Sequence, residues 1–300
     1  MIYYQVNAFT YNGKNGNPAG VVICDGDDFP SEDTMQGVAA AYGHSETAFV
    51  LAGSADGELS LRYFTPECEV DLCGHATIAS FKALMDARLV ERGRDYVCHT
   101  KAGDVTVKPE QHFISMETAH GRVISTVKDK NSLQVIYSSL DTPYDPVRIM
   151  PACNRFINLN PMVVDNGLPF LIVPINGVDK LNALTPNKEL IMEISRALQC
   201  AGIYAFAFEP KEIGLMAHCR GFYPLIGIDE ESATGTGVAA LSFYLNGFGT
   251  LPAEREAAYL QGEAMNRTSE LITFIKGSGD DMRILVGGDA EIIEKRSIRM

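Results

Sequence analysis

Apolar residues near the start of the chain recur with the two periods that distinguish strands from helices. The stretches "YYQVNAF" (3–9) and "ELSLRYFT" (58–65) alternate, as half-buried strands do. The short runs "AGVVIC" (19–24) and "ETAFVL" (46–51) are mainly apolar and rich in strand-forming residues, which predicts two further strands. The turn-rich segment "NGKNGNPAG" (12–20) separates the first two of these strands.

Two longer segments carry helical periodicity instead. Residues 29–43 predict a helix with Ser31 as its N-cap and Gly43 at its end. The apolar residues of this helix lie on one face: Met35, Val38, Ala39 and Tyr42. Residues 74–90, "GHATIASFKALMDARLV", predict a second, more apolar helix. Several strands follow it up to about residue 117.

The pattern weakens over residues 118–150, which contain Pro143 and Pro146 in a mixed-charge segment. We therefore expect an N-terminal domain over 1–118, a crossing segment over 119–150 and a C-terminal domain over 151–300. The final strands of the chain could return to the first domain.

The second half repeats the first in order. "GNPAGVVI" is echoed by "GLPFLIVPI" (167–175), "ETAFVL" by "IYAFAF" (203–208), "RYFTP" by "RGFYP" (220–224), and "CGHATIASFKAL" by "TGTGVAALSFYL" (234–245). Chance similarity could explain any one echo, but four in the same order favour a duplicated unit. The predicted fold class is α+β, with two similar pseudo-symmetric domains. Each is a sheet wrapped around a central helix, and the two face each other across a cleft.

Composition narrows the function classes. The 300 residues are 46% hydrophobic and 21% charged, and no apolar run is long enough for a membrane helix. The N-terminus lacks the features of a signal peptide, so we expect a cytoplasmic protein with no membrane partner. A net charge of −13 argues against a nucleic-acid partner. The seven cysteines include no Cys-x-x-Cys pair, so neither a zinc site nor a disulfide framework is expected.

Matched glycines mark the candidate site. Gly74 and Gly235 each precede an apolar helix, whose N-terminus presents unpaired N–H groups and a partial positive charge. The glycines could simply allow close packing of helix on sheet. Because they occur in register, we instead predict a pair of anion pockets that hold a substrate carboxylate.

The differences between the halves limit the chemistry. Cys73 is matched by Thr234, and His75 by Thr236. A racemase with two thiols would need a second cysteine, because a threonine hydroxyl is far too weak an acid. A single base remains available. Glu46, matched in our alignment by Ile203, is the best candidate, although it could be a solvated loop acid.

The residues alone leave two roles open for His75 and argue against a catalytic role for Cys73. A histidine in the first turn of a helix is often only a polar cap, but next to an anion pocket it could position substrate or relay a proton. With Thr234 at the partner position, we interpret Cys73 as inherited rather than catalytic.

Several blocks resemble the PhzF (phenazine biosynthesis) family: "GNPAGVV", "HSETAFVL", "RYFTPECEVDLCGHATIASF", "ESATGTGVAAL" and "QGEAMNR". They occur in the family's order over about residues 5–267. The resemblance implies the diaminopimelate-epimerase-like fold and a cofactor-free isomerase in a biosynthetic process, usually a homodimer. The family's named reaction isomerises trans-2,3-dihydro-3-hydroxyanthranilate by moving a proton between ring carbons with a glutamate.

Carried over by motif, that glutamate is Glu46, and the family's histidine after Cys-Gly is His75. Glu231 stands where the family has a functional aspartate, Thr236 where it has serine, and Asn17 in "GNPAGVV" joins the expected substrate-binding residues. Glutamate lengthens the acidic arm by one methylene, and proton-transfer geometry tolerates little change. We therefore expect the reaction type to be kept but the phenazine substrate to differ.

Three hypotheses follow. The first is a one-base isomerase of a small carboxylate-bearing substrate that uses Glu46, His75 and Glu231, with Asn17, Gly74, Gly235 and Thr236 binding the substrate. The second is an amino-acid epimerase or racemase that uses an unsymmetrical pair, Cys73 and some group from the second half; Thr234 remains only a possible site residue. The third is a non-catalytic relative that binds a small acid. None of them calls for a cofactor or metal.

Overall fold

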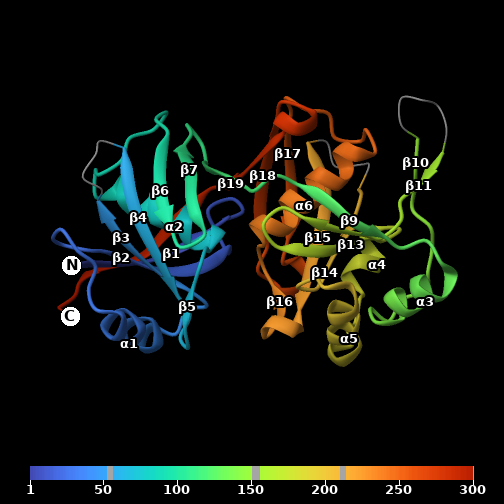
Figure 1. Ribbon diagram of the computed structural model, residues 1–300, viewed down its shortest axis with the longest axis horizontal. Helices are drawn as coiled ribbons and strands as arrows, with labels where there is room; N and C mark the ends of the chain where they lie inside the picture. The colour runs from blue at the N-terminus through green and yellow to red at the C-terminus, as the bar shows by residue number, and fades with distance from the viewer. Residues whose placement is uncertain (53–56, 151–155, 210–213, 300) are drawn as a thin grey trace. The chain divides into compact units, whose positions relative to one another are not determined.

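The computed structural model describes residues 1–52, 57–150, 156–209 and 214–299, and these form two compact units (Figure 1). Unit 1 comprises Met1–Glu117 and Gly287–Met300, and unit 2 comprises Thr118–Val286. No helix within the described ranges has the length and apolar character needed to cross a membrane.

In the part of unit 1 that the structure describes there are two helices and most of the first half's strands. The helices are α1 (Glu32–Tyr42) and α2 (Gly74–Asp86). The strands are β1 (Ile2–Ala8), β2 (Asn17–Ile23), β3 (Thr47–Ala52), β4 (Glu58–Phe64), β5 (Glu69–Val70), β6 (Tyr96–Thr100), β7 (Gly103–Pro109), β8 (Ile114–Glu117) and β20 (Ala290–Ser297). The strand β19 (Arg283–Gly288) begins in unit 2 and ends in unit 1.

The described residues of unit 2 form the helices α3 (Lys130–Ser138), α4 (Val178–Asn182), α5 (Lys188–Leu198) and α6 (Gly235–Gly247). Its strands are β9 (Arg122–Thr126), β10 (Arg148–Ile149), β11 (Ile157–Asn158), β12 (Met162–Asp165), β13 (Pro169–Pro174), β14 (Ile203–Ala207), β15 (Leu215–Tyr223), β16 (Ile228–Glu231), β17 (Glu256–Gln261) and β18 (Ser269–Lys276). Short 3₁₀ turns span η1 (Pro224–Ile226), η2 (Glu263–Met265) and η3 (Gly279–Asp281).

The boundary between the units differs from the one predicted. Residues 119–150 were expected to cross between domains, but β9 pairs with β12 and α3 contributes Leu133, Ile136 and Tyr137 to the core of unit 2. The chain returns at its end, because β20 pairs with β1 in unit 1. The weak pattern of 118–150 reflects a single amphipathic helix and a strand exposed along most of its length.

The two units share one strand plan. In unit 1, β2 runs parallel to β3, β3 antiparallel to β4, β4 parallel to β6 and β6 antiparallel to β7. In unit 2 the strands β13, β14, β15, β17 and β18 repeat the same sequence of orientations. The short strand β5 pairs with β4 in unit 1, and the short strand β16 pairs with the equivalent strand β15 in unit 2. The predicted α+β class and the internal repeat are confirmed.

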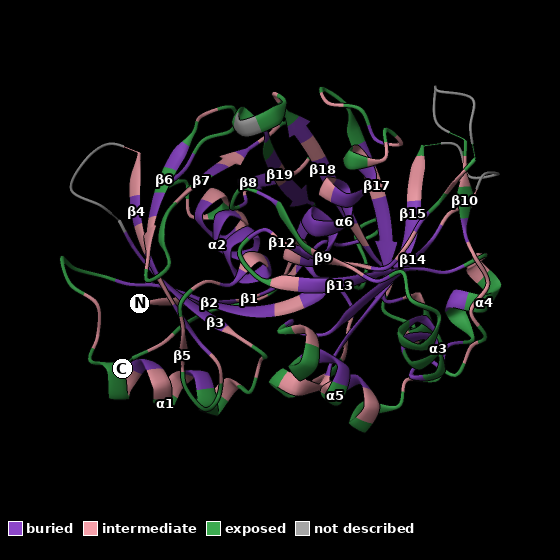
Figure 2. Cartoon of the chain, turned by 45° about the vertical axis from the view of Figure 1, so that its right-hand side comes forward, coloured by how far each residue is buried: buried purple, intermediate pink, exposed green. Residues whose placement is uncertain are grey.

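A helix buried on nearly all sides lies at the centre of each unit. The helix α2 packs against β1, β2, β3, β8 and β20, and α6 packs against β12, β13 and β18. Both helices have 13 residues, most of them buried (Figure 2). A helix that is apolar around its whole circumference needs such an enclosure, so only its ends can offer polar groups to a ligand.

The remaining helices cover the outer faces. Met35 and Ala39 of α1 pack on Tyr3, Val22 and Phe49 of the sheet in unit 1. In unit 2, α3, α4 and α5 cover the outer face in the same way. The predicted caps of α1 are confirmed, since the Ser31 hydroxyl accepts from the Thr34 N–H and Gly43 is left-handed with φ 65°.

The helix α2 ends four residues earlier than predicted, at Asp86 rather than residue 90. Arg88 adopts a left-handed φ of 59°, and the Leu89 N–H donates to the Leu84 carbonyl at 2.9 Å. This reversal closes the last turn while apolar Leu89 and Val90 continue the apparent pattern in the sequence.

Strand registers correct one pairing of the repeat. Gly20 lies opposite Thr47, whereas the equivalent Leu171 lies opposite Ile203. Ile203 is therefore the counterpart of Thr47, and the residue before it, Gly202, is the counterpart of Glu46. The sequence alignment paired Glu46 with Ile203. All five residues of β14 are buried, so no alternation was present to fix its register.

Gly202 cannot carry a side chain. A Cβ atom at this residue would lie 2.1 Å from the backbone carbonyl oxygen of Phe222, on the neighbouring strand β15. Unit 2 therefore has no room for an acid at the position that Glu46 occupies in unit 1.

We predict that Gly202→Ala destabilises the protein by about 3 kcal/mol, because the clash is with a hydrogen-bonded strand backbone that cannot move aside. Urea unfolding followed by circular dichroism measures the shift in midpoint. Gly37→Ala is the control, since a Cβ there meets no atom within 4 Å. Equal midpoints for the two variants would contradict this account.

Candidate active site

The candidate acid and base groups of unit 1 come from two segments. Glu46 follows the end of α1 and directly precedes β3. Cys73 is the N-cap residue of α2, and His75 is the second residue of that helix. The fold therefore brings together residues almost 30 positions apart at the N-terminus of the buried helix.

These side chains form a chain of close contacts. The Cys73 Sγ lies 3.3 Å from His75 Nδ1, and His75 Nε2 lies 3.3 Å from Glu46 Oε2. The Ser45 hydroxyl lies 3.4 Å from the same Nε2 atom. Cys73 and His75 are buried, and Glu46 is 17% exposed. The predicted trio is thus one cluster, and Ser45 joins it although the sequence did not single it out.

Burial sets the charge of the imidazole. It lowers the pKa of His75, and the opposing effect of the Glu46 carboxylate is smaller. A neutral imidazole has one donor and one acceptor nitrogen. The contacts fit a thiol that donates to Nδ1 and an Nε2–H that faces Glu46. An imidazole held neutral offers no positive charge to stabilise a thiolate.

The carboxylate of Glu46 is incompletely satisfied. Its Oε2 atom is buried and makes no hydrogen bond of good geometry in the described structure, although it lies within ion-pair distance of His75. Leaving a buried acceptor without a hydrogen bond costs about 1–3 kcal/mol. Such groups in a native protein call for an explanation, and catalysis is a common one.

The same three residues could be considered as metal ligands, because one donor atom from each lies within 4.8 Å of the others. The geometry favours a hydrogen-bonded chain instead. The Cys73 sulfur lies beside Nδ1 of the imidazole and the Glu46 carboxylate beside Nε2, each at 3.3 Å, which is hydrogen-bonding distance. The hydrogen-bonded chain accounts for a contact at each of the two ring nitrogens.

Gly74 begins α2 and is not required for packing. A Cβ at this residue would meet only the Met116 side chain, at an ordinary distance of 3.5 Å. The helix would therefore pack on the sheet equally well with a side chain at this position, which argues against the alternative explanation of the glycine. Asn17, the other predicted binding residue of unit 1, is the first residue of β2 and is buried.

In unit 2 the candidate residues surround the N-terminus of α6. Thr234 is the N-cap, and Gly235 and Thr236 begin the helix. The Thr234 hydroxyl donates to Glu231 Oε2 at 2.9 Å, so Thr234 and Glu231 are directly joined. Glu231 is the last residue of β16 and lies opposite Gly221. In unit 1 the equivalent residue is Val70, opposite Tyr63.

The acids of the two units therefore occupy different positions of the shared plan. Glu46 precedes the third strand of unit 1, where unit 2 has Gly202. Glu231 ends the short strand before the helix of unit 2, where unit 1 has Val70. Each unit carries one acid on a segment near the N-terminus of its own central helix.

One partly buried ion pair in each unit supports these segments, and the sequence analysis missed both. Arg62 makes two hydrogen bonds to the carboxylate of Glu69, at 2.7 and 2.9 Å. The equivalent Arg220 makes two to Glu230, both at 2.8 Å. Arg62 lowers the pKa of Glu69 to about 2. The repeated arginine of "RYFTP" and "RGFYP" was the available signal.

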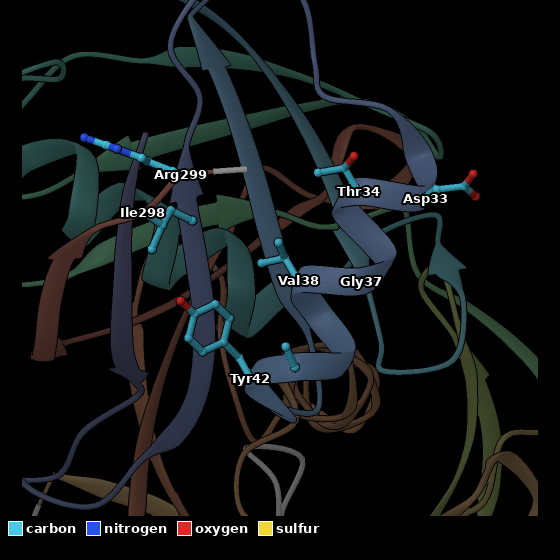
Figure 3. A pocket seen from close by; sticks show the side chains of 8 residues that line it. Asp33, Thr34, Gly37, Val38, Tyr42, Ile298 and Arg299 are labelled. Atoms are coloured by element: carbon cyan, nitrogen blue, oxygen red, sulfur yellow. The ribbon is translucent and has the colours of Figure 1, made fainter.

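A separate hollow of about 400 Å³ lies in unit 1 between α1 and the end of the chain (Figure 3). Its lining residues are exposed or half-buried: Asp33, Thr34, Gly37, Val38, Ala41, Tyr42, Ile298 and Arg299. None of the predicted site residues lines it. The chemistry of the Glu46 cluster identifies the candidate site better than the volume of this hollow.

Two α+β units on one plan, each with a buried central helix, define a diaminopimelate-epimerase-like fold. Residues 6–296 match the family model described as phenazine biosynthesis-like protein, PhzC-PhzF. The chain therefore belongs to this family, as its sequence blocks predicted.

Relatives and solved structures agree with this assignment. The chain is 30% identical to an uncharacterized isomerase, YfhB, of Bacillus subtilis, over 99% of this chain and 98% of that protein. It is also 30% identical to an uncharacterized isomerase, YddE, of Escherichia coli K12, over 97% and 95%. A PhzF family protein from Bacillus anthracis has a similar structure, with a TM-score of 0.84, 24% identity and coverage of 100% and 99%.

A more distant structure shares the fold alone. A hydroxyproline epimerase from Agrobacterium vitis matches with a TM-score of 0.61 and 12% identity, covering 99% of this chain and 91% of that one.

We predict that the neutral state of His75 makes folding stability fall on mild acidification. Its pKa is lowered in the folded state from an ordinary 6.5, so the unfolded chain takes up a proton as the pH falls through that value while the folded protein does not. Urea unfolding at pH 7.5, 6.5 and 5.5 measures the change. His75→Gln should lose less stability over this range than the parent; an equal or larger loss would contradict the assignment.

Proposed function

We propose that the protein is a cofactor-independent isomerase that moves a proton within a small carboxylate-bearing substrate, with Glu46 as the single base. The observation that carries the proposal is the buried Oε2 atom of Glu46, which lacks a well-formed hydrogen bond next to a neutral imidazole. The Glu46 side chain is 17% exposed, and a carboxylate bound this loosely is suited to take a proton from a substrate carbon. Membership of a family whose curated relatives are named isomerases supports the reaction class.

The reaction balances without a redox step. The Glu46 carboxylate removes a proton from a carbon next to an electron-withdrawing group, and the C–H electron pair delocalises into that group. The protonated Glu46 then returns the proton to another carbon of the same conjugated system. The bonds made and broken are C–H, O–H and the shifted π bond, so the product is an isomer.

The other residues bind and orient in this proposal. The N–H groups at the start of α2, with Gly74 allowing close approach, bind the substrate carboxylate and stabilise charge that develops during proton transfer. His75 orients Glu46 and relays protons. Glu231 positions a polar group of the substrate, while Asn17, Gly235 and Thr236 contribute hydrogen bonds.

The assembly and setting remain part of the proposal. We infer a homodimer from the family resemblance and no nucleic-acid partner from the net charge of −13, and we propose that the protein is cytoplasmic. The substrate is a small cyclic or unsaturated amino or hydroxy acid.

A second candidate is an epimerase that uses Cys73. The 3.3 Å contact between its Sγ and His75 Nδ1 favours it, because a histidine can serve as the proton acceptor of a thiol. The neutral imidazole argues against a resting thiolate, so we rank this candidate second.

We predict that the protein catalyses deuterium incorporation into its substrate in D₂O and that Glu46→Gln slows it by about 10²–10⁴-fold. The assay incubates trans-2,3-dihydro-3-hydroxyanthranilate, proline and 4-hydroxyproline separately with the protein and follows mass and proton NMR. Glu67→Gln is the matched control, being the same change at an exposed loop residue.

Two outcomes of this assay overturn the proposal. Undiminished exchange in Glu46→Gln would exclude Glu46 as the base. Loss of exchange in Cys73→Ala, with Glu46→Gln active, would favour the epimerase.

We also predict that Gly74→Ala leaves the unfolding midpoint unchanged or slightly raised but increases KM at least about tenfold. The added methyl group fits the protein, and alanine favours helices over glycine, but it blocks the approach of a carboxylate to the helix N-terminus. Steady-state kinetics on the substrate found above measures KM, with Gly37→Ala as the control. A folded Gly74→Ala protein with the parent KM would rule out this binding mode.

A further inference from the structure

Gln261 is a fully buried polar residue for which the proposed reaction has no use so far. It ends β17 and belongs to the block "QGEAMNR". Its side-chain amide takes part in four hydrogen bonds. Gln261 Oε1 accepts from the Tyr204 hydroxyl at 3.0 Å and the Thr234 N–H at 3.1 Å, and its Nε2 donates to the Glu231 carbonyl at 2.7 Å and the Thr234 hydroxyl at 3.0 Å.

Two backbone groups fix the orientation of this amide. The Thr234 N–H can only donate, so the atom that faces it must be the oxygen of Gln261. The Glu231 carbonyl can only accept, so the atom that faces it must be the nitrogen. A flipped amide would place its NH₂ group against the Thr234 N–H, donor against donor, and its oxygen against the Glu231 carbonyl, acceptor against acceptor.

The amide in turn fixes the direction of the Thr234 hydroxyl. That oxygen accepts from Gln261 Nε2 at 3.0 Å and from the Tyr223 hydroxyl at 3.1 Å. Burial, with a further contribution from the charge of Glu231, raises the pKa of Tyr223 well above its ordinary range, so the phenol keeps its proton. Because both acceptor sites of the Thr234 oxygen are occupied, its own proton points to Glu231 Oε2, at 2.9 Å.

The backbone leaves little freedom for another arrangement. Gly262, next to Gln261, has a φ of 84°, and a Cβ there would lie 2.9 Å from the Ser232 carbonyl oxygen. The end of β17 therefore lies directly against the segment between β16 and α6. Ser232, within that segment, is only 2% exposed.

We infer that Gln261 is a positioning residue for Glu231. By directing the Thr234 O–H, it holds the Glu231 carboxylate as a hydrogen-bond acceptor in one orientation beside the N-terminus of α6. A substrate group that meets Glu231 would then be a donor, such as an ammonium or hydroxyl group. Only the contact between Glu231 and a substrate donor rests on the proposed function.

A spectroscopic test does not depend on activity. Protein labelled with ¹³C at the glutamate carboxyl carbons gives a Glu231 resonance, identified by its loss in Glu231→Gln. Gln261→Met, which keeps length but removes the amide, should move that resonance, as should Thr234→Val. Thr234→Ser, which keeps the hydroxyl, should leave it near the parent position.

Thr273→Val is the matched control. It removes a buried hydrogen bond of the same unit, between the Thr273 and Ser242 hydroxyl groups at 2.8 Å, on a strand other than the one that carries Glu231. A Glu231 resonance that is unmoved by Gln261→Met, or moved equally by Thr273→Val, would overturn the inference.

Kinetics then tests the functional part. On the substrate found by deuterium exchange, Gln261→Met should lower kcat up to about 100-fold in the parent and have little further effect in the Glu231→Gln background. Equal losses in both backgrounds would show a merely structural role and overturn the inference. Failure of the one-base proposal would instead appear as exchange that Glu46→Gln leaves intact, with the spectroscopic result unaffected.

Discussion

Each unit is organised by the need to enclose one apolar helix. Side chains on every face of α2 and α6 are buried, so the surrounding strands must curve around the helix. The N–H groups of the first turn cannot be satisfied inside the helix and must find partners outside it. The enclosure therefore creates a polar, partly positive end within an apolar unit, and the candidate catalytic residues of each unit lie on segments beside that end.

The duplicated plan separates what the fold requires from what the chemistry requires. The strand orientations and the paired arginine–glutamate contacts occur in both units at equivalent positions. The acids do not, because Glu46 is replaced by Gly202 and Glu231 by Val70. In unit 2 the carbonyl of Phe222 occupies the space that a side chain at Gly202 would need. The two acids are therefore features that the shared fold does not require.

Much of this fold could be predicted from the sequence, because the hydrophobic periodicity and the capping residues of the first half indicate the same elements. Ser31 and Gly43 bound α1 as predicted, and the four echoes correspond to equivalent elements. The errors arose where the local pattern of apolar residues determines neither the register of a strand nor the end of a helix. The fully buried β14 shows no alternation, and a left-handed Arg88 ends α2 inside an apolar run. The residues Glu46, His75 and Cys73 were found from the differences between the halves and from motif resemblance, whereas the link from Gln261 through Thr234 to Glu231 required side-chain geometry.

The central claim is that one carboxylate, Glu46, both removes and returns the proton. The most direct measurement follows a substrate that carries deuterium at the donor carbon through a single turnover in ordinary water. A single base predicts that part of the deuterium is found at the acceptor carbon of the product, because the proton removed by Glu46 is the one it returns. Product that contains only solvent hydrogen at that carbon, with all deuterium lost to water, would contradict the claim and indicate two separate groups.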